Sequence, residues 1–217
     1  MILAEEARRP RVQLPNSLAR KTRRRLLVSK LIAAGLLGLV LVSHDIYAEN
    51  SAWELILESA AFLLLLTGAM GRIWAGAYIA GKKSQVLVRE GPYSIVRNPL
   101  YFFSLLAALG AGLAFDSLSI ALLMGGGLLL THWQAILEEE RWLQVTFGAA
   151  FESYRETVPR FVPKPKLLSP GGLIEFDPLR FSHHLLESSL ILLAFPLARL
   201  VEWCHQSSLL PCLLRLP

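Results

Sequence analysis

The sequence predicts an all-α integral membrane protein with about five transmembrane helices. Hydrophobic residues make up 53% of its 217 residues and charged residues only 18%, against about 25% charged in a typical soluble domain. The mean hydropathy is +0.45. The apolar residues fall in runs close to the length of a membrane span, because about 20 helical residues cross a hydrocarbon core of about 30 Å. These observations argue against a disordered chain, a disulfide scaffold and an ordinary soluble enzyme.

Five apolar segments are expected to be helical, and they cover residues 31–46, 59–80, 100–115, 118–137 and 185–203. The second and fourth have the full length of a span, whereas the first and third are shorter. The fifth contains Pro196 and carries Glu187 and Arg199. It either crosses the membrane or lies on its surface, and the two alternatives place the C-terminus on opposite sides.

The third and fourth segments are separated only by Asp116 and Ser117. Both residue types favour tight turns, because their short polar side chains bond to nearby backbone groups. The sequence therefore predicts an antiparallel helical hairpin at this point.

The basic residues indicate an orientation. Nineteen of the 22 lysines and arginines precede the first segment, or lie between segments two and three or four and five. Cytoplasmic loops carry such an excess, so residues 1–30 are predicted to form a basic cytoplasmic segment. A bacterial inner membrane is the expected location. Nucleic acid is not an expected partner, because no aromatic residues are interleaved with these charges.

Metal binding is not expected either. The chain has no paired cysteines at ligand spacing and no HExxH motif. His183 and His184 are adjacent, so they do not share a helix face as metal-binding histidines at i, i+4 do.

The stretch before the third segment is unlike an ordinary loop. Gly91-Pro92 is a turn signal, Pro99 suits the first turn of a helix, and Asn98 stands where a helix N-cap belongs. A helix N-terminus beside Arg97 could hold a carboxylate or a phosphate. The alternative is a snorkelling arginine with a capping asparagine and an interfacial tyrosine.

Charged side chains at the end of the fourth segment and inside the second also need an explanation. Glu138, Glu139 and Glu140 are adjacent, and like charges on one helix repel. They form either a solvated face or a site for a cationic ligand. Arg72 is about 15 Å along a helix from Lys82, too deep for comfortable snorkelling, and intramembrane charges usually face the bundle interior and mark a site.

Several motifs in a fixed order give a resemblance to a known family. They are Arg72-Ile73-Trp74-Ala75, Gly91-Pro92-Tyr93, Arg97-Asn98-Pro99-Leu100-Tyr101, Glu139-Glu140-Arg141-Trp142-Leu143, Phe147-Gly148, Tyr154 and Pro159-Arg160-Phe161-Val162-Pro163. Over residues 68–163 the chain resembles the isoprenylcysteine carboxyl methyltransferases, and more distantly the phospholipid N-methyltransferases. A membrane core of residues 31–163, followed by a C-terminal segment of 164–217 with the fifth helix, is the expected organisation.

The resemblance implies an S-adenosylmethionine-dependent membrane methyltransferase with a cytoplasmic cofactor pocket. Its acceptor would be lipid-like or small and hydrophobic, bearing a carboxylate, a thiol or an amine. Arg160, Arg72 and Glu140 are then the candidate catalytic residues. Glu139 or Glu140 would bind the cofactor's ammonium, and Arg97 with the helix start at Pro99 would bind its carboxylate. The cofactor-binding set is Tyr93, Val96, Arg97, Asn98, Pro99, Tyr101, Glu139, Glu140 and Tyr154.

The chain departs from the family at Asn98, where a histidine is usual. An amide does not titrate, so any proton transfer by that histidine is absent here. Asn98 is the main support for one alternative, a non-catalytic membrane protein that kept the fold. The other alternative is a nicotinamide-dependent membrane reductase related to the sterol reductases, which share a related C-terminal core.

Overall fold

A computed structural model describes residues 16–45, 52–80, 86–172 and 176–216, and over these residues the chain is almost entirely helical. The longer helices are α1 (Asn16–Val42), α2 (Ala52–Ile79), α4 (Pro99–Leu113), α5 (Leu118–Phe147), α7 (Pro178–Leu190) and α8 (Ala194–Gln206). The shorter ones are α3 (Pro92–Ile95), α6 (Ala149–Thr157), η3 (Pro165–Leu167) and η4 (Ile191–Leu193). Strands β1 (Ser43–Asp45) and β2 (Leu214–Leu216) pair in parallel.

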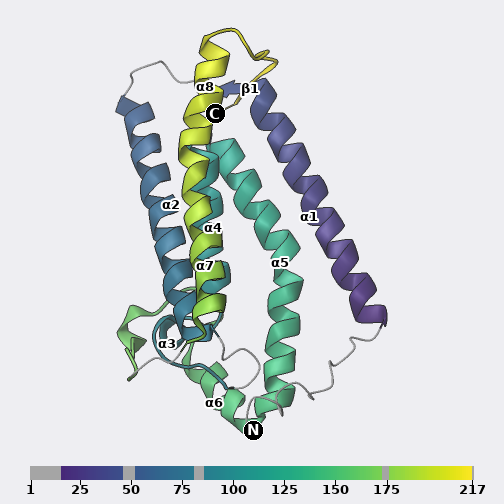
Figure 1. The fold of residues 1–217 in the computed structure, drawn as a ribbon, viewed down its shortest axis with the longest axis vertical. Coiled ribbons are helices and arrows are strands. Elements are labelled where there is room, and N and C mark those ends of the chain that lie inside the picture. Colours follow the sequence, from purple (N-terminus) through teal and green to yellow (C-terminus); the bar gives the residue numbers. More distant parts are fainter. Residues whose placement is uncertain (1–15, 46–51, 81–85, 173–175, 217) are drawn as a thin grey trace.

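The long helices form a bundle whose members run alternately in opposite directions (Figure 1). The two small helices α3 and α6 lie at one end of the bundle, and β1 and the end of α8 lie at the other. Three helical segments are long and apolar enough to cross a membrane: Ala52–Ile79, Leu118–Phe147 and Pro178–Gln206. Shorter apolar helices occupy Lys30–Val42 and Pro99–Leu113. Each of the five predicted segments therefore contains a helix, and the chain has the features of an integral membrane protein.

Several helix boundaries differ from those expected. The first helix ends at Val42, because the next three residues pair with Leu214–Leu216 instead. The fourth was expected to end near residue 137, but α5 continues to Phe147. The fifth segment begins at Pro178 and passes through one 3₁₀ turn, Ile191–Leu193, just before Pro196. Proline lacks the N–H that donates the i to i−4 hydrogen bond inside a helix. The 3₁₀ turn lies where the bond from Pro196 would otherwise form.

The predicted hairpin between the third and fourth segments is confirmed. Asp116 turns the chain with a positive φ of 52°, and the Ser117 hydroxyl accepts a hydrogen bond of 3.2 Å from the Ile120 backbone N–H. Ser117 is therefore the N-cap of α5.

Small residues let the helices of this bundle approach closely. A Cβ atom added to Gly110 on α4 would lie 2.7 Å from the Leu65 backbone nitrogen on α2, and one added to Gly112 would lie 2.2 Å from the Ala121 Cα on α5. Backbone contact of this kind is how membrane helices gain packing energy without a hydrophobic driving force. It fixes α2, α4 and α5 as the rigid frame that carries the site.

An arginine-centred cluster joins three elements at the β1 end of the bundle. Arg199 on α8 pairs with Glu58 on α2, with Asp116 of the hairpin at 2.5 Å, and with Glu202 at 2.6 Å. Burial raises the pKa of Asp116 to about 6, although Arg199 acts in the opposite direction. Of the two charged residues noted in the fifth segment, Arg199 is thus paired with carboxylates inside the bundle.

Candidate active site

The loop before α4 forms the floor of the site at the opposite end of the bundle. Gly91 has a positive φ of 57°, and a Cβ there would lie 2.3 Å from the Tyr78 ring, so glycine is required. The Gly91 N–H donates to the Ser169 carbonyl at 2.7 Å, and the Tyr78 hydroxyl donates to the Pro170 carbonyl at 2.7 Å. The segment that follows residue 163 is therefore folded back over this loop.

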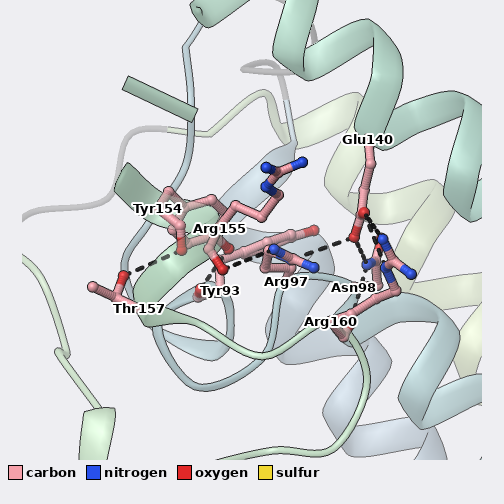
Figure 2. Close-up of polar contacts among 8 residues, drawn as sticks. All are labelled: Tyr93, Arg97, Asn98, Glu140, Tyr154, Arg155, Thr157 and Arg160. Carbon is pink, nitrogen blue, oxygen red and sulfur yellow. Dashed lines mark hydrogen bonds and ion pairs between the residues drawn. The ribbon is translucent and has the colours of Figure 1, made fainter. Parts of the chain in front are cut away.

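Asn98 occupies the N-cap position of α4, and Pro99 is the first helical residue, as predicted. The Asn98 side chain, however, makes no capping bond. Its amide instead donates to Glu140 Oε1 and to the Arg160 carbonyl, both at 3.1 Å (Figure 2). The expected capping bond, in which the side-chain oxygen would accept from a backbone N–H, is therefore absent. The amide N–H groups point instead to a buried carboxylate, with which they form a charge-assisted hydrogen bond.

Glu140 joins the parts of the site. Its carboxylate pairs with Arg97 Nε at 3.3 Å and with Arg160 Nη2 at 2.9 Å, in addition to accepting the Asn98 amide (Figure 2). The Glu140 and Arg97 side chains are only 8% and 7% exposed, whereas that of Arg160 is 39% exposed. Two arginines and an amide explain how a carboxylate can be buried here.

Arg97 is held on several sides. Its backbone N–H donates to the Pro159 carbonyl at 2.9 Å, and Nη1 donates to the Arg155 carbonyl at 3.0 Å. Burial lowers the pKa of Arg97, and the Glu140 carboxylate acts in the opposite direction. Arg97 thereby ties the start of α4 to α6 and to the segment after it.

Helix α6 reaches this position through Gly148, whose positive φ of 53° turns the chain at the end of α5. Tyr154 on α6 is buried, and its hydroxyl donates to the Tyr93 carbonyl at 2.6 Å (Figure 2). Burial also raises the pKa of Tyr154. The phenylalanine–glycine and tyrosine motifs noted in the sequence therefore close one wall of the site.

Two neighbouring cavities open among these elements, and they share lining residues. The first, which we call the α5–α6 cavity, has a volume of about 320 Å³. The second, which we call the α7 cavity, has a volume of about 250 Å³. Both are lined by Ile79, Tyr93, Arg97, Asn98, Tyr101 and Glu139. The α5–α6 cavity adds Val86, Leu87, Val88, Ala135, Trp142, Leu143 and Tyr154, and the α7 cavity adds Ala80, Pro99, Leu100, Arg180 and His184.

Tyr93 carries a free hydroxyl at this junction. The Tyr93 Oη atom is buried, and it has no hydrogen-bond partner among the described residues. Burial raises the pKa of Tyr93, so the hydroxyl stays protonated. A buried hydroxyl without a partner is costly, and one on a cavity wall is suited to a ligand's polar group.

The predicted site residues fall into three groups. Those that line a cavity are Tyr93, Arg97, Asn98, Pro99, Tyr101, Glu139 and Tyr154. Glu140 and Val96 are buried behind the wall, and Arg160 is bound to Glu140. Arg72 lies apart: it donates to Ser104 on α4 and is about 10 Å along α2 from Ile79, the cavity residue on its own helix.

His132, on α5, packs against α4. Its ring lies beside Tyr101 with centroids 5.8 Å apart, and Nδ1 is 3.0 Å from the Leu128 carbonyl oxygen. The residues that sequence reasoning missed are Arg180 and His184. They lie outside the motif region, and no spacing signal connects them with it.

Known proteins are similar to this chain over the region that forms the site. A family model described as phospholipid methyltransferase matches residues 67–150. The cobalt-zinc-cadmium resistance protein CzcN of Cupriavidus metallidurans is 32% identical over 146 residues, which is 67% of each chain. The nickel-cobalt-cadmium resistance protein NccN of Alcaligenes xylosoxydans xylosoxydans is 27% identical over 94% of this chain and 98% of its own.

A third relative carries an enzyme name. The protein-S-isoprenylcysteine O-methyltransferase of Schizosaccharomyces pombe is 35% identical over 81 residues, which is 37% of this chain and 34% of the yeast protein. No solved structure matches this chain. The chain belongs to the same family as CzcN, and its residues 67–150 match the phospholipid methyltransferase family model. Family membership and the apolar helices together indicate a membrane methyltransferase.

Proposed function

We propose that this protein is an integral-membrane methyltransferase that uses S-adenosylmethionine and methylates a lipid-like or small hydrophobic acceptor. The observation that carries the proposal is the α5–α6 cavity, which combines an acidic residue, a free buried hydroxyl and apolar walls. All of its lining residues except Tyr154 lie within the family-matched region. Its volume of about 320 Å³ lies within the range of small-molecule sites.

The residues present suit this cofactor. Glu139 offers a carboxylate to the cofactor's ammonium, and its own contact is a long hydrogen bond of 3.4 Å from Tyr101. The N-terminus of α4, with its positive dipole end, suits the cofactor's carboxylate. Tyr93 adds its free hydroxyl, while Trp142 and Leu143 give apolar surface for the adenine ring. Glu140 is not available, because both of its oxygens are engaged.

The residues of this chain would act by position more than by acid–base chemistry. When bound, S-adenosylmethionine supplies an electrophilic methyl group on a cationic sulfur. The charged network of Glu140, Arg97 and Arg160 fixes the cavity walls, which lowers the entropic cost of aligning acceptor and methyl group. Asn98 lines both cavities, so the position where a family histidine is usual holds no titratable group.

The apolar helices and the charge pattern support a five-span layout with the N-terminus and both cavities on the cytoplasmic side. A bacterial inner membrane suits this layout. Alkaline phosphatase fused after Pro217 should be active outside the cytoplasm, and green fluorescent protein fused there should stay dark. The reverse result would mean that the α7–α8 segment does not cross.

An activity assay tests the reaction. Purified protein with tritiated-methyl S-adenosylmethionine should transfer label into an organic extract of bacterial membranes. Because two relatives are named as metal-resistance proteins, the extract should come from cells grown with and without cadmium. Label in neither extract, together with NADPH oxidation, would favour the reductase alternative, which the family match does not favour.

A further inference from the structure

The side of the α7 cavity formed by α7 has no role in cofactor binding as set out above. It is lined by Arg180 and His184 of α7 together with the apolar residues Ile79, Ala80 and Leu100. Its remaining lining residues, apart from Pro99, also line the α5–α6 cavity. We propose that the α7 cavity binds the methyl acceptor, that this acceptor is an apolar thiol, and that His184 removes the thiol proton. The proposal rests on the proposed function.

The start of α7 is fixed so that these two side chains reach the cavity. Asp177 caps the helix, since its Oδ1 accepts from the backbone N–H groups of Leu179 at 2.9 Å and Arg180 at 3.2 Å. The Asp177 N–H in turn donates to the Ala80 carbonyl at the end of α2 at 3.3 Å. Arg180 and His184 are four residues apart and therefore lie on one face of α7.

A glycine on α2 allows this approach. A Cβ added to Gly76 would lie 3.0 Å from the His184 Cβ. The His184 side chain on α7 therefore packs close to the backbone of α2 at this point. His183, the neighbouring residue, is exposed and lines neither cavity. The two adjacent histidines therefore have different surroundings, which the sequence did not indicate.

The groups lining the α7 cavity leave His184 as the proton acceptor. Arg97 is bound to Glu140, and Glu139 is assigned to the cofactor's ammonium. Tyr93 is held protonated by burial, which raises its pKa. Arg180 pairs with Asp177 at 3.3 Å and its side chain is 62% exposed, so it lies at the mouth. Imidazole is the side chain suited to taking a proton near neutral pH.

The same charges indicate the acceptor class. A carboxylate acceptor has no proton to lose at neutral pH and needs no base. An ammonium acceptor is disfavoured beside the cations Arg97 and Arg180. A thiol is neutral when it enters an apolar cavity, and it must lose its proton to become a strong nucleophile.

The step is balanced without a further reactant. An electron pair of the acceptor sulfur forms the bond to the methyl carbon, while the bond from that carbon to the cofactor's sulfur breaks. That bond's electrons remain on the leaving sulfur, which departs as a neutral thioether. The thiol proton passes to the His184 ring and then to water.

The test uses 1-decanethiol and decanoic acid as probes, with tritiated-methyl S-adenosylmethionine and the full-length protein in detergent. We expect label in decanethiol and none in decanoic acid. His184→Gln should lower the rate with decanethiol at pH 7 by about 10²–10⁴-fold, the usual contribution of a general base. The rate should recover as the pH approaches 10, where the thiol ionises unaided. His183→Gln, the matched control, should behave as the wild type.

Binding of S-adenosylhomocysteine separates this proposal from the one on which it rests. Both histidine variants should bind it as the wild type does, which also shows that they are folded. If the wild type binds it but labels decanoic acid instead, or if His184→Gln matches the wild type at pH 7, the acceptor proposal is wrong. If the wild type does not bind S-adenosylhomocysteine, the proposed function itself is wrong, and the acceptor proposal falls with it.

Discussion

Replacing Glu140 with glutamine should lower the free energy of unfolding by about 3 kcal/mol, because removing one partner of a buried ion pair strands the other charge. Arg97 is 7% exposed and would lose its buried counter-charge. The expected loss is at the lower end of the usual range, since Arg160 is 39% exposed and can turn to water. An SDS titration monitored by helical circular dichroism measures the change.

Glu139→Gln is the matched control for this stability effect. It makes the same chemical change one residue earlier, on a side chain that faces a cavity and is not part of the arginine network. Its unfolding curve should overlay that of the wild type. Equal stability for Glu140→Gln and the wild type would show that the Glu140 network does not hold the site together.

Glu139→Gln should weaken binding of S-adenosylhomocysteine roughly ten- to a hundredfold, since a hydrogen bond to a charged group contributes about 1.5–3 kcal/mol. The carboxylate is the acidic group lining the α5–α6 cavity among the described residues. Glutamine keeps the size of the side chain and removes only its charge. Isothermal titration of the detergent-purified protein gives the affinity.

Glu138→Gln provides the control for this affinity effect, because Glu138 is exposed and lines neither cavity. Its affinity should match that of the wild type. If Glu138→Gln and Glu139→Gln weaken binding equally, the effect is one of general charge, and the assignment of Glu139 to the ammonium is wrong. Among the three adjacent glutamates, we therefore expect Glu140 to affect stability, Glu139 to affect cofactor affinity and Glu138 to affect neither.

Much of the fold could be predicted from local signals. The apolar runs gave all five helical segments, and Asp116-Ser117 gave the hairpin, because turn and capping chemistry depends on neighbouring residues. These features require no knowledge of distant contacts.

The rest depended on contacts between distant segments. The fourth apolar segment was expected to end before the three glutamates, but α5 continues through them. The charge of Glu140 is neutralised there by Arg97 and Arg160, which are 43 and 20 residues away in the sequence. The Asn98 side chain makes no capping bond, and its amide N–H donates to the same carboxylate. Arg180 and His184 reach the site only because the C-terminal segment folds back onto α2.

Binding of S-adenosylmethionine in the α5–α6 cavity can be tested by calorimetric titration with S-adenosylhomocysteine. The full-length protein in detergent, with its folded state shown by circular dichroism, is titrated with this compound and separately with NADPH. We expect saturable one-to-one binding of S-adenosylhomocysteine in the micromolar range and no binding of NADPH. Folded protein that binds NADPH alone, or neither compound, would contradict it.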